Sequence, residues 1–174
     1  MLTTLLSKVV KNIDRINLTI GRSVSWLTTI LVILICIDVA ARHLFKQASA
    51  ALPELEWHVF SLIFLLGAGY TLQKDRHVRV DVFYARFSQK AKAWVNLLGS
   101  ILLLLPFCLL VMDASIPYIK MAYLINEGST DPGGLPARFL IKGSIFVGFF
   151  LLLLQGVSLF CSSLLCILDE KRCA

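Results

Sequence analysis

The chain has 174 residues, of which 57% are hydrophobic and only 16% are charged, and its net charge is +6. This composition lies outside the range of soluble globular domains and predicts an integral membrane protein. Because one membrane-spanning helix needs about 20 mostly apolar residues, the length accommodates a few spans and no additional soluble domain. The basic residues cluster at the ends of apolar runs, as topology determinants do, so we expect no nucleic-acid partner.

The first 22 residues place apolar and charged side chains on opposite sides of a helix. This pattern predicts an amphipathic helix in the membrane interface over 1–22. The apolar run that follows predicts a first span at about 23–45, with Asp38 and Arg42 near its far end. These two residues are four positions apart and share a helix face, so we expect a local ion pair, with contact to a partner subunit as the alternative.

A second span is predicted at about 54–72. Glu54 lies in its first turn, where an acidic side chain complements the helix dipole. Gly67 and Gly69 allow a neighbouring helix to approach closely. A basic segment then begins at Gln73, and so much charge cannot lie in lipid, so it separates the second span from the third.

We interpret 73–92 as a cytoplasmic joint that continues into a surface-lying amphipathic helix. The cations assigned to lipid headgroups or to membrane topology are Arg76, Arg79, Arg86, Lys90 and Lys92. A third span is predicted at about 93–112, with a kink at Pro106 because proline removes a backbone hydrogen bond. Proline and glycine then predict a loop over 113–138.

A fourth span is predicted at about 139–168, with Gly143, Gly148 and Gly156 as points of close helix contact. The fold class is therefore an all-α integral membrane protein, a single membrane domain over 1–174. It has four transmembrane helices and two amphipathic helices, one N-terminal and one central, on the cytoplasmic face. Most Lys and Arg residues flank the two termini and the basic joint, so the positive-inside rule predicts that both termini are cytoplasmic.

The sequence contains no nucleophile elbow, phosphate-binding glycine loop or zinc-protease motif, so we expect neither an enzyme nor a bound cofactor or metal. His43 and His58 lie at the same predicted membrane face and could ligate a haem, which leaves a redox anchor as one alternative. A self-contained homo-oligomeric exporter is a second alternative. The middles of the spans contain no Asp, Glu, Lys or Arg, which favours an accessory subunit over either.

Several short elements of the sequence form a recognisable set. They are Arg42, Pro53-Glu54-Leu55, Phe60, Leu65-Leu66-Gly67-Ala68, His77-Val78-Arg79-Val80-Asp81 and Gly134-Leu135-Pro136. Together they resemble a known family, the small membrane subunit of tripartite ATP-independent periplasmic (TRAP) transporters, over nearly the whole chain from the first span onward. Trp57 departs from the family pattern, because many relatives carry a basic residue there.

The resemblance implies a scaffold subunit in the inner membrane of a bacterium. Its partners would be the large membrane subunit, which carries the substrate by an elevator-like movement, a periplasmic substrate-binding protein, and phospholipid. Uptake would be coupled to sodium in the large subunit, and the substrate would be a C4-dicarboxylate, a sialic acid or another carboxylate. The 113–138 loop would then be periplasmic and help to dock the binding protein.

The resemblance also implies structural or partner-contact roles for individual residues. His77 and Asp81, four positions apart, would fix the turn from the second span into the surface helix. Arg42 and Glu54, both near the outer face, would contact each other, the large subunit or the binding protein. The full set is Arg42, Glu54, Gly67, His77, Arg79, Asp81, Gly134 and Pro136.

Overall fold

The computed structural model describes residues 2–46, 49–74 and 87–168, and its regular secondary structure in these ranges is helical. Four helical stretches are long and apolar enough to cross a membrane, which confirms the predicted all-α fold with four spans. The elements are α1 (Leu2–Leu44), α2 (Ala51–Gln73), α4 (Gln89–Gly99), the π-helical segment η1 (Ser100–Leu104), α5 (Leu105–Leu124) and α6 (Phe139–Leu168).

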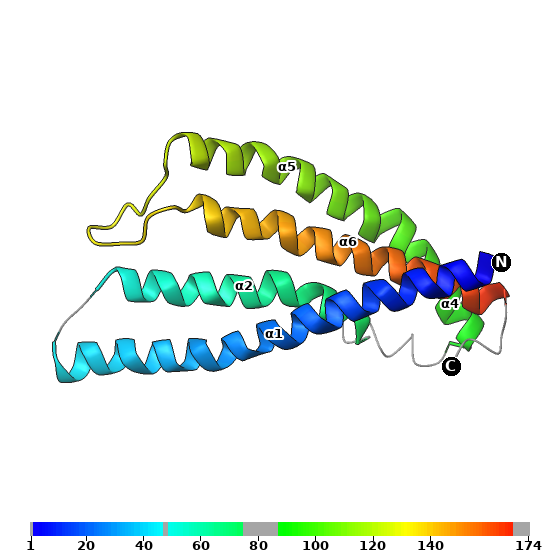
Figure 1. Cartoon of the computed structure of the whole chain (residues 1–174), viewed down its shortest axis with the longest axis horizontal. Helices are drawn as coiled ribbons and strands as arrows, with labels where there is room; N and C mark the ends of the chain where they lie inside the picture. Colours follow the sequence, from blue (N-terminus) through cyan, green and yellow to red (C-terminus); the bar gives the residue numbers. More distant parts are fainter. Residues whose placement is uncertain (1, 47–48, 75–86, 169–174) are drawn as a thin grey trace.

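The helices lie side by side in an elongated bundle in which α6 is central (Figure 1). α6 contacts each of the other elements, whereas α1 packs mainly on α2 and α6. In the most apolar 18-residue stretch of α6, half of the residues are buried, whereas 11% are buried in the corresponding stretch of α1. The core that α6 forms with its neighbours includes Leu72, Cys108 and Leu152. α6 therefore determines how the other helices are placed.

The start of α1 and the end of α6 lie at the same end of the bundle, which we call the terminal end (Figure 1). The connection after α1 and the loop between α5 and α6 lie at the opposite end, the loop end. Four antiparallel crossings return the chain to the side on which it began. The first and last described helical residues therefore lie at one end of the bundle.

The predicted division of the N-terminal region at residue 22 is wrong, because α1 is one continuous helix from Leu2 to Leu44. The buried residues in its N-terminal half include Ile13, Asn17, Gly21 and Val24, whereas Val9 and Ile16 of the apolar face are exposed. Gly21 marks a helix contact and no break, since a Cβ atom there would collide with the Tyr70 ring of α2. Asp14 and Asn17 of this segment form hydrogen bonds with side chains of α6, and no separate interfacial helix forms.

The third predicted span is too short, since helix α5 continues to Leu124 where a loop was expected from residue 113. Pro117 lies inside this helix. Packing overrides the proline here, because Ser115 and Ala122 are buried and Tyr123 makes an edge contact with Phe139 of α6. The irregularity expected at Pro106 takes the form of η1, a π-helical segment that ends two residues before it.

The second and fourth spans are confirmed, as α2 covers Ala51–Gln73 and α6 covers Phe139–Leu168. Residues 75–86, which include much of the predicted joint and surface helix, lie outside the described residues, so that part stays a prediction. The helix α4 begins after Ser88, whose hydroxyl accepts a hydrogen bond from the Ala91 N–H. From Gln89 the helix continues through η1 into α5 as a single candidate span, because α4 packs on α6 and no residue breaks the helix.

Candidate partner-contact site at the loop end

Glu54 lies in the first turn of α2, directly after Pro53, whose missing N–H is tolerated at a helix start. The predicted position of the acidic residue at the helix N-terminus is confirmed. Although the turn lies at the edge of the bundle, Glu54 is only 6% exposed. A buried carboxylate requires partners, and they come from a part of the chain far away in sequence.

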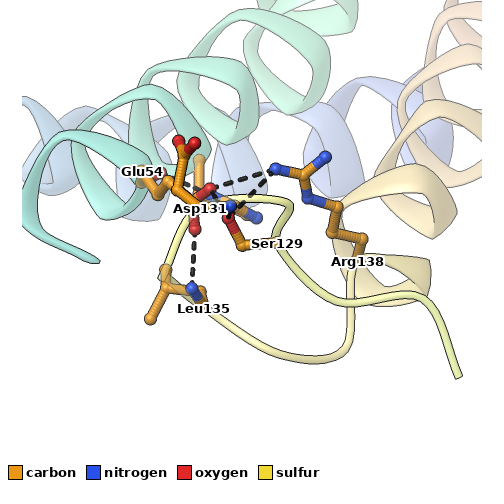
Figure 2. A network of polar contacts seen from close by, with 6 residues as sticks. Glu54, Ser129, Asp131, Leu135 and Arg138 are labelled. Atoms are coloured by element: carbon orange, nitrogen blue, oxygen red, sulfur yellow. Dashed lines mark hydrogen bonds and ion pairs between the residues drawn. The ribbon is translucent and has the colours of Figure 1, made fainter. Parts of the chain in front are cut away.

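The Glu54 carboxylate accepts three hydrogen bonds from the segment between α5 and α6 (Figure 2). The donors are the Ser129 hydroxyl, the Leu135 N–H at 2.6 Å, and the Arg138 guanidinium at 3.0 Å, which also supplies the opposite charge. We call Glu54, Ser129, Leu135 and Arg138 the Glu54 clamp. It attaches α2 to the loop before α6 through charge-assisted hydrogen bonds.

Gly134 is required for the close approach of this loop to α2. A Cβ atom at Gly134 would lie 2.8 Å from Glu54 Oε2 and would collide with Ser129. The loop is closed by the Ser129 N–H, which donates to the Leu135 carbonyl at 3.0 Å, and by the Asp131 N–H, which donates to the Ser129 hydroxyl at 3.0 Å. The Gly134-Leu135-Pro136 element thus supplies both the space and one donor for Glu54.

Glu54 and Arg42 pair with other residues of the chain and not with each other, so this one of the three predicted alternatives is wrong, while contact with the large subunit or the binding protein stays a prediction. Arg42 instead forms an ion pair with Asp38, one turn earlier on α1, which confirms the local pair predicted from their spacing. Asp38 is 1% exposed, whereas the Arg42 side chain is 52% exposed. Glu54 instead forms its ion pair with Arg138, a residue to which the sequence analysis assigned no contact.

A cleft of about 410 Å³ lies beside the clamp between α2, α5 and α6. Its wall is aromatic, with Trp57, Phe60 and Phe64 from α2. At its polar edge Lys142 Nζ lies 2.5 Å from a Glu127 carboxylate oxygen and 3.9 Å from the centre of the Tyr118 ring. This second ion pair holds the start of the loop against the first turn of α6, in addition to the clamp.

His58, the candidate haem ligand, already has partners inside α2. Its Nδ1 lies 2.5 Å from the Glu54 carbonyl oxygen, and its ring stacks on Trp57 with centroids 3.9 Å apart. His43 is exposed near the end of α1. Within the described ranges, no group of three or more His, Cys, Asp or Glu side chains could hold a metal ion.

A second polar cluster, which the sequence analysis missed, joins α1 to α6 toward the terminal end. Asn17 Nδ2 donates to Gln155 Oε1 at 2.9 Å, and Gln155 Nε2 donates to Asp14 Oδ1 at 2.9 Å. Ser158 Oγ donates to the same Asp14 oxygen at 2.8 Å. We call these four residues the polar seam. The signal in the sequence was the presence of Gln155 and Ser158 inside the most apolar helix.

The polar seam yields a stability prediction. Asn17→Ala and Gln155→Ala are each expected to destabilise the bundle, because the remaining partner is buried without its hydrogen bond. The two effects should not add. A double-mutant cycle on equilibrium unfolding in mixed micelles should give a coupling energy of about 1 kcal/mol, the usual scale for hydrogen bonds between membrane helices. A coupling energy indistinguishable from zero would contradict the hydrogen bond between Asn17 and Gln155 in the polar seam.

The predicted contact glycines fall into two groups, according to whether an added Cβ atom would meet a neighbouring helix. A Cβ atom at Gly69 would collide with the Asn17 amide, and one at Gly148 would lie 2.8 Å from the Leu65 carbonyl oxygen. One at Gly156 would lie 3.0 Å from the Leu104 side chain. These close contacts are confirmed. No described residue lies within 4 Å of such an atom at Gly67 or Gly143, so the contacts expected there are not formed within the described part of the chain.

The other predicted contact residues are placed as follows. Pro136 is exposed in the loop, and Lys90 and Lys92 lie in the first turn of α4. Five predicted residues lie outside the part of the chain that the structure describes, and their assigned roles stay predictions. They are Arg76, His77, Arg79, Asp81 and Arg86.

The chain matches the family model described as "Tripartite ATP-independent periplasmic transporters, DctQ component" over residues 31–166. The chain belongs to this family. The match contains all four residues of the Glu54 clamp, and it confirms the resemblance drawn from the short elements of the sequence. No curated protein and no solved structure matches the chain.

The DctQ assignment decides between the functional alternatives. A DctQ component is a non-catalytic membrane subunit of a transporter, so the chain is not an enzyme, as predicted. The family assignment supports the transporter-subunit alternative over the haem-binding redox anchor and the self-contained exporter. The residues before position 31, which include Asp14 and Asn17 of the polar seam, lie outside the matched range.

Proposed function

We propose that this DctQ component is a scaffold that packs against the stationary part of the large TRAP membrane subunit. The main support is the arrangement of its polar groups. The buried polar residues Asn17, Asp38, Glu54 and Gln155 all have partners within the chain, and the remaining surface of the spans is largely apolar. Such a bundle provides helix surface for lipid and a partner protein.

The loop end is proposed to help dock the periplasmic substrate-binding protein. The tip of the loop, residues 130–133, is exposed, while the Glu54 clamp holds its base against α2. A loop that is fixed before binding loses less conformational entropy when a partner binds. The clamp is therefore suited to present a rigid surface, and the Arg42 side chain, exposed on α1, adds a cation near the same end.

Further parts of the assignment are proposals from the family. The transporter would take up an organic acid, such as a C4-dicarboxylate or a sialic acid, with sodium coupling in the large subunit and no cofactor in this chain. His77, Arg79 and Asp81 would order the joint between the second and third spans. Arg76, Arg86, Lys90 and Lys92 would contact phospholipid headgroups.

Co-purification tests the scaffold role. The tagged chain, extracted from its native membrane in mild detergent, is expected to bring one large polytopic protein with it in near-equal amount. Proteoliposomes that contain the chain alone are expected to show no uptake, while those with the large subunit and the binding protein take up substrate. Recovery of the chain alone from the native membrane, or transport without the other two proteins, would contradict the proposal.

Labelling of introduced cysteines tests the proposed orientation, with both termini cytoplasmic. Thr130→Cys at the exposed loop tip should react with a membrane-impermeant maleimide in intact spheroplasts, because the loop would be periplasmic. Ser7→Cys near the start of α1 should react only after the membrane is opened. The parent chain provides the background for native cysteines. The reverse pattern would place the loop end in the cytoplasm.

A further inference from the structure

A second cavity, of about 420 Å³, lies at the terminal end of the bundle between α1, α2 and α6. Its polar lining includes Lys11, Arg15 and Gln73, and its apolar lining includes Val10 and Leu165. It is separate from the cleft beside the Glu54 clamp, which lies at the other end. Its combination of two cations with an apolar wall distinguishes it from the rest of the surface.

The two cations are not neutralised within the described part of the chain. Lys11 and Arg15 are four positions apart on one face of α1 and are exposed, and neither side chain forms an ion pair or hydrogen bond with a described residue. Asp14 also lines the cavity, but its Oδ1 accepts hydrogen bonds from Gln155 and Ser158 of α6. Among the described residues that line the cavity, two cations stand against one carboxylate, so this lining has a net positive charge.

Gln73 contributes a side-chain oxygen that accepts no hydrogen bond from any described residue. Its Nε2 donates to the Asp14 carbonyl oxygen at 2.8 Å, whereas its Oε1 is buried without a hydrogen-bond partner in the described structure. Buried polar atoms normally have partners, and because Gln73 lines the cavity, a rotation of its side chain would let this oxygen accept a hydrogen bond from a group bound there. A ligand that suits this cavity carries negative charge for the two cations and a hydroxyl group for this oxygen.

The depth of the cavity indicates where such a ligand comes from. At 1.5 Å per residue, Leu165 lies about 39 Å along α6 from its start at the loop end. A bilayer with its headgroup regions is about 40–45 Å thick, so the cavity lies at the headgroup level of the leaflet at the terminal end. Val10 and Leu165 then face the upper part of the acyl chains.

We propose that this cavity binds the headgroup of one anionic phospholipid. Lys11 and Arg15 hold its phosphate, Gln73 accepts a hydrogen bond from a headgroup hydroxyl such as that of phosphatidylglycerol, and the apolar wall receives the first part of an acyl chain. Lipid bound here joins α1 to α2 and α6 at the end of the bundle that lacks the Glu54 clamp. The inference concerns residues 10–18, 73 and 165 and does not depend on the proposed transport function.

Native mass spectrometry of the full chain tests the site, with phosphatidylglycerol and phosphatidylcholine of identical acyl chains as probes. We expect the parent chain to retain phosphatidylglycerol preferentially. The Lys11→Gln/Arg15→Gln double variant should bind it roughly 10- to 30-fold more weakly, because each cation near an anionic membrane surface contributes about a factor of five. Lys11→Arg/Arg15→Lys, which keeps both charges, should retain most of the affinity.

Lys8→Gln is the matched control, because Lys8 is exposed on the same helix, one turn from Lys11, but does not line the cavity. An equal loss of affinity in Lys8→Gln and the double variant would show a diffuse surface effect and overturn the site. Equal retention of both lipids by the parent chain would overturn it as well. Competition by soluble glycerol phosphate as effective as by the lipid would overturn the assignment to phospholipid in favour of a free phosphate.

Discussion

Glu54→Ala is expected to release the loop before α6 from α2 and to lower uptake by the assembled transporter on the order of tenfold or more. The substitution leaves the Arg138 guanidinium, the Leu135 N–H and the Ser129 hydroxyl without their shared acceptor. When a buried group loses its charged partner, the resulting destabilisation exceeds the net stabilisation that their hydrogen bond provided. If the clamp holds the loop in position for docking, uptake should decrease as the loop becomes less ordered.

Three measurements distinguish loss of the clamp from general unfolding. Limited proteolysis should cut the variant faster within 125–138, the thermal midpoint of the purified complex should fall by roughly 5 °C, and uptake in proteoliposomes should decrease. Glu54→Gln should be intermediate, since an amide oxygen still accepts hydrogen bonds but carries no charge for Arg138.

Glu56→Ala is the matched control for this experiment. Glu56 lies two residues further along the same helix, and one of its carboxylate oxygens is buried with no hydrogen-bond partner among the described residues. Its removal breaks no bond in the clamp, so loop protection and uptake should stay close to those of the parent. Normal proteolysis and uptake in Glu54→Ala would contradict the role of the clamp.

Gly148→Ala and Gly69→Ala are expected to destabilise the bundle by about 1–3 kcal/mol each, the usual cost of overpacking a close contact. At Gly148 the added methyl group meets the Leu65 carbonyl, which is backbone, so α2 must move away from α6. At Gly69 it meets the Asn17 amide and lies 3.2 Å from the Leu151 carbonyl oxygen. Both substitutions separate the helices that α6 holds together.

Each of these glycines has a matched control on its own helix. Gly143→Ala on α6 and Gly67→Ala on α2 add the same methyl group where nothing lies within 4 Å. They are expected to be neutral or to stabilise by up to about 1 kcal/mol, because alanine favours the helix over glycine. Equilibrium unfolding in mixed micelles would measure all four. Equal destabilisation by the four substitutions would show that helix contact is not the cause.

Gly67→Ala also tests a partner contact, because Gly67 belongs to the elements that resemble the family but a Cβ atom there would meet no described residue of this chain within 4 Å. If it packs against the large subunit, the variant chain keeps its own stability and loses co-purification of that partner. Normal co-purification would remove Gly67 from the proposed interface. The experiment thus tests the partner contact separately from the fold.

The sequence predicted the spans most accurately where apolar length alone decides them. The residues 139–168 contain no turn signals and form α6 with the predicted bounds. The errors lie where local signals compete with packing. Pro117 suggested a loop but lies in α5, and the amphipathic pattern over 1–22 suggested a surface helix but belongs to a continuous α1. In both cases contact with α6 favours helix over the locally preferred alternative.

Composition and apolar length predicted a four-span membrane protein, because lipid imposes a minimum apolar length on each span. The resemblance of short local motifs to the TRAP small subunit predicted the family and indicated Glu54 and Gly134, and residue spacing predicted the local Asp38–Arg42 pair. Only the tertiary structure decided that Glu54 pairs with Arg138, 84 residues away, and that Asn17 pairs with Gln155, 138 residues away. Hydrogen bonds between distant helices depend on which faces meet, and that follows from the packing of the whole bundle.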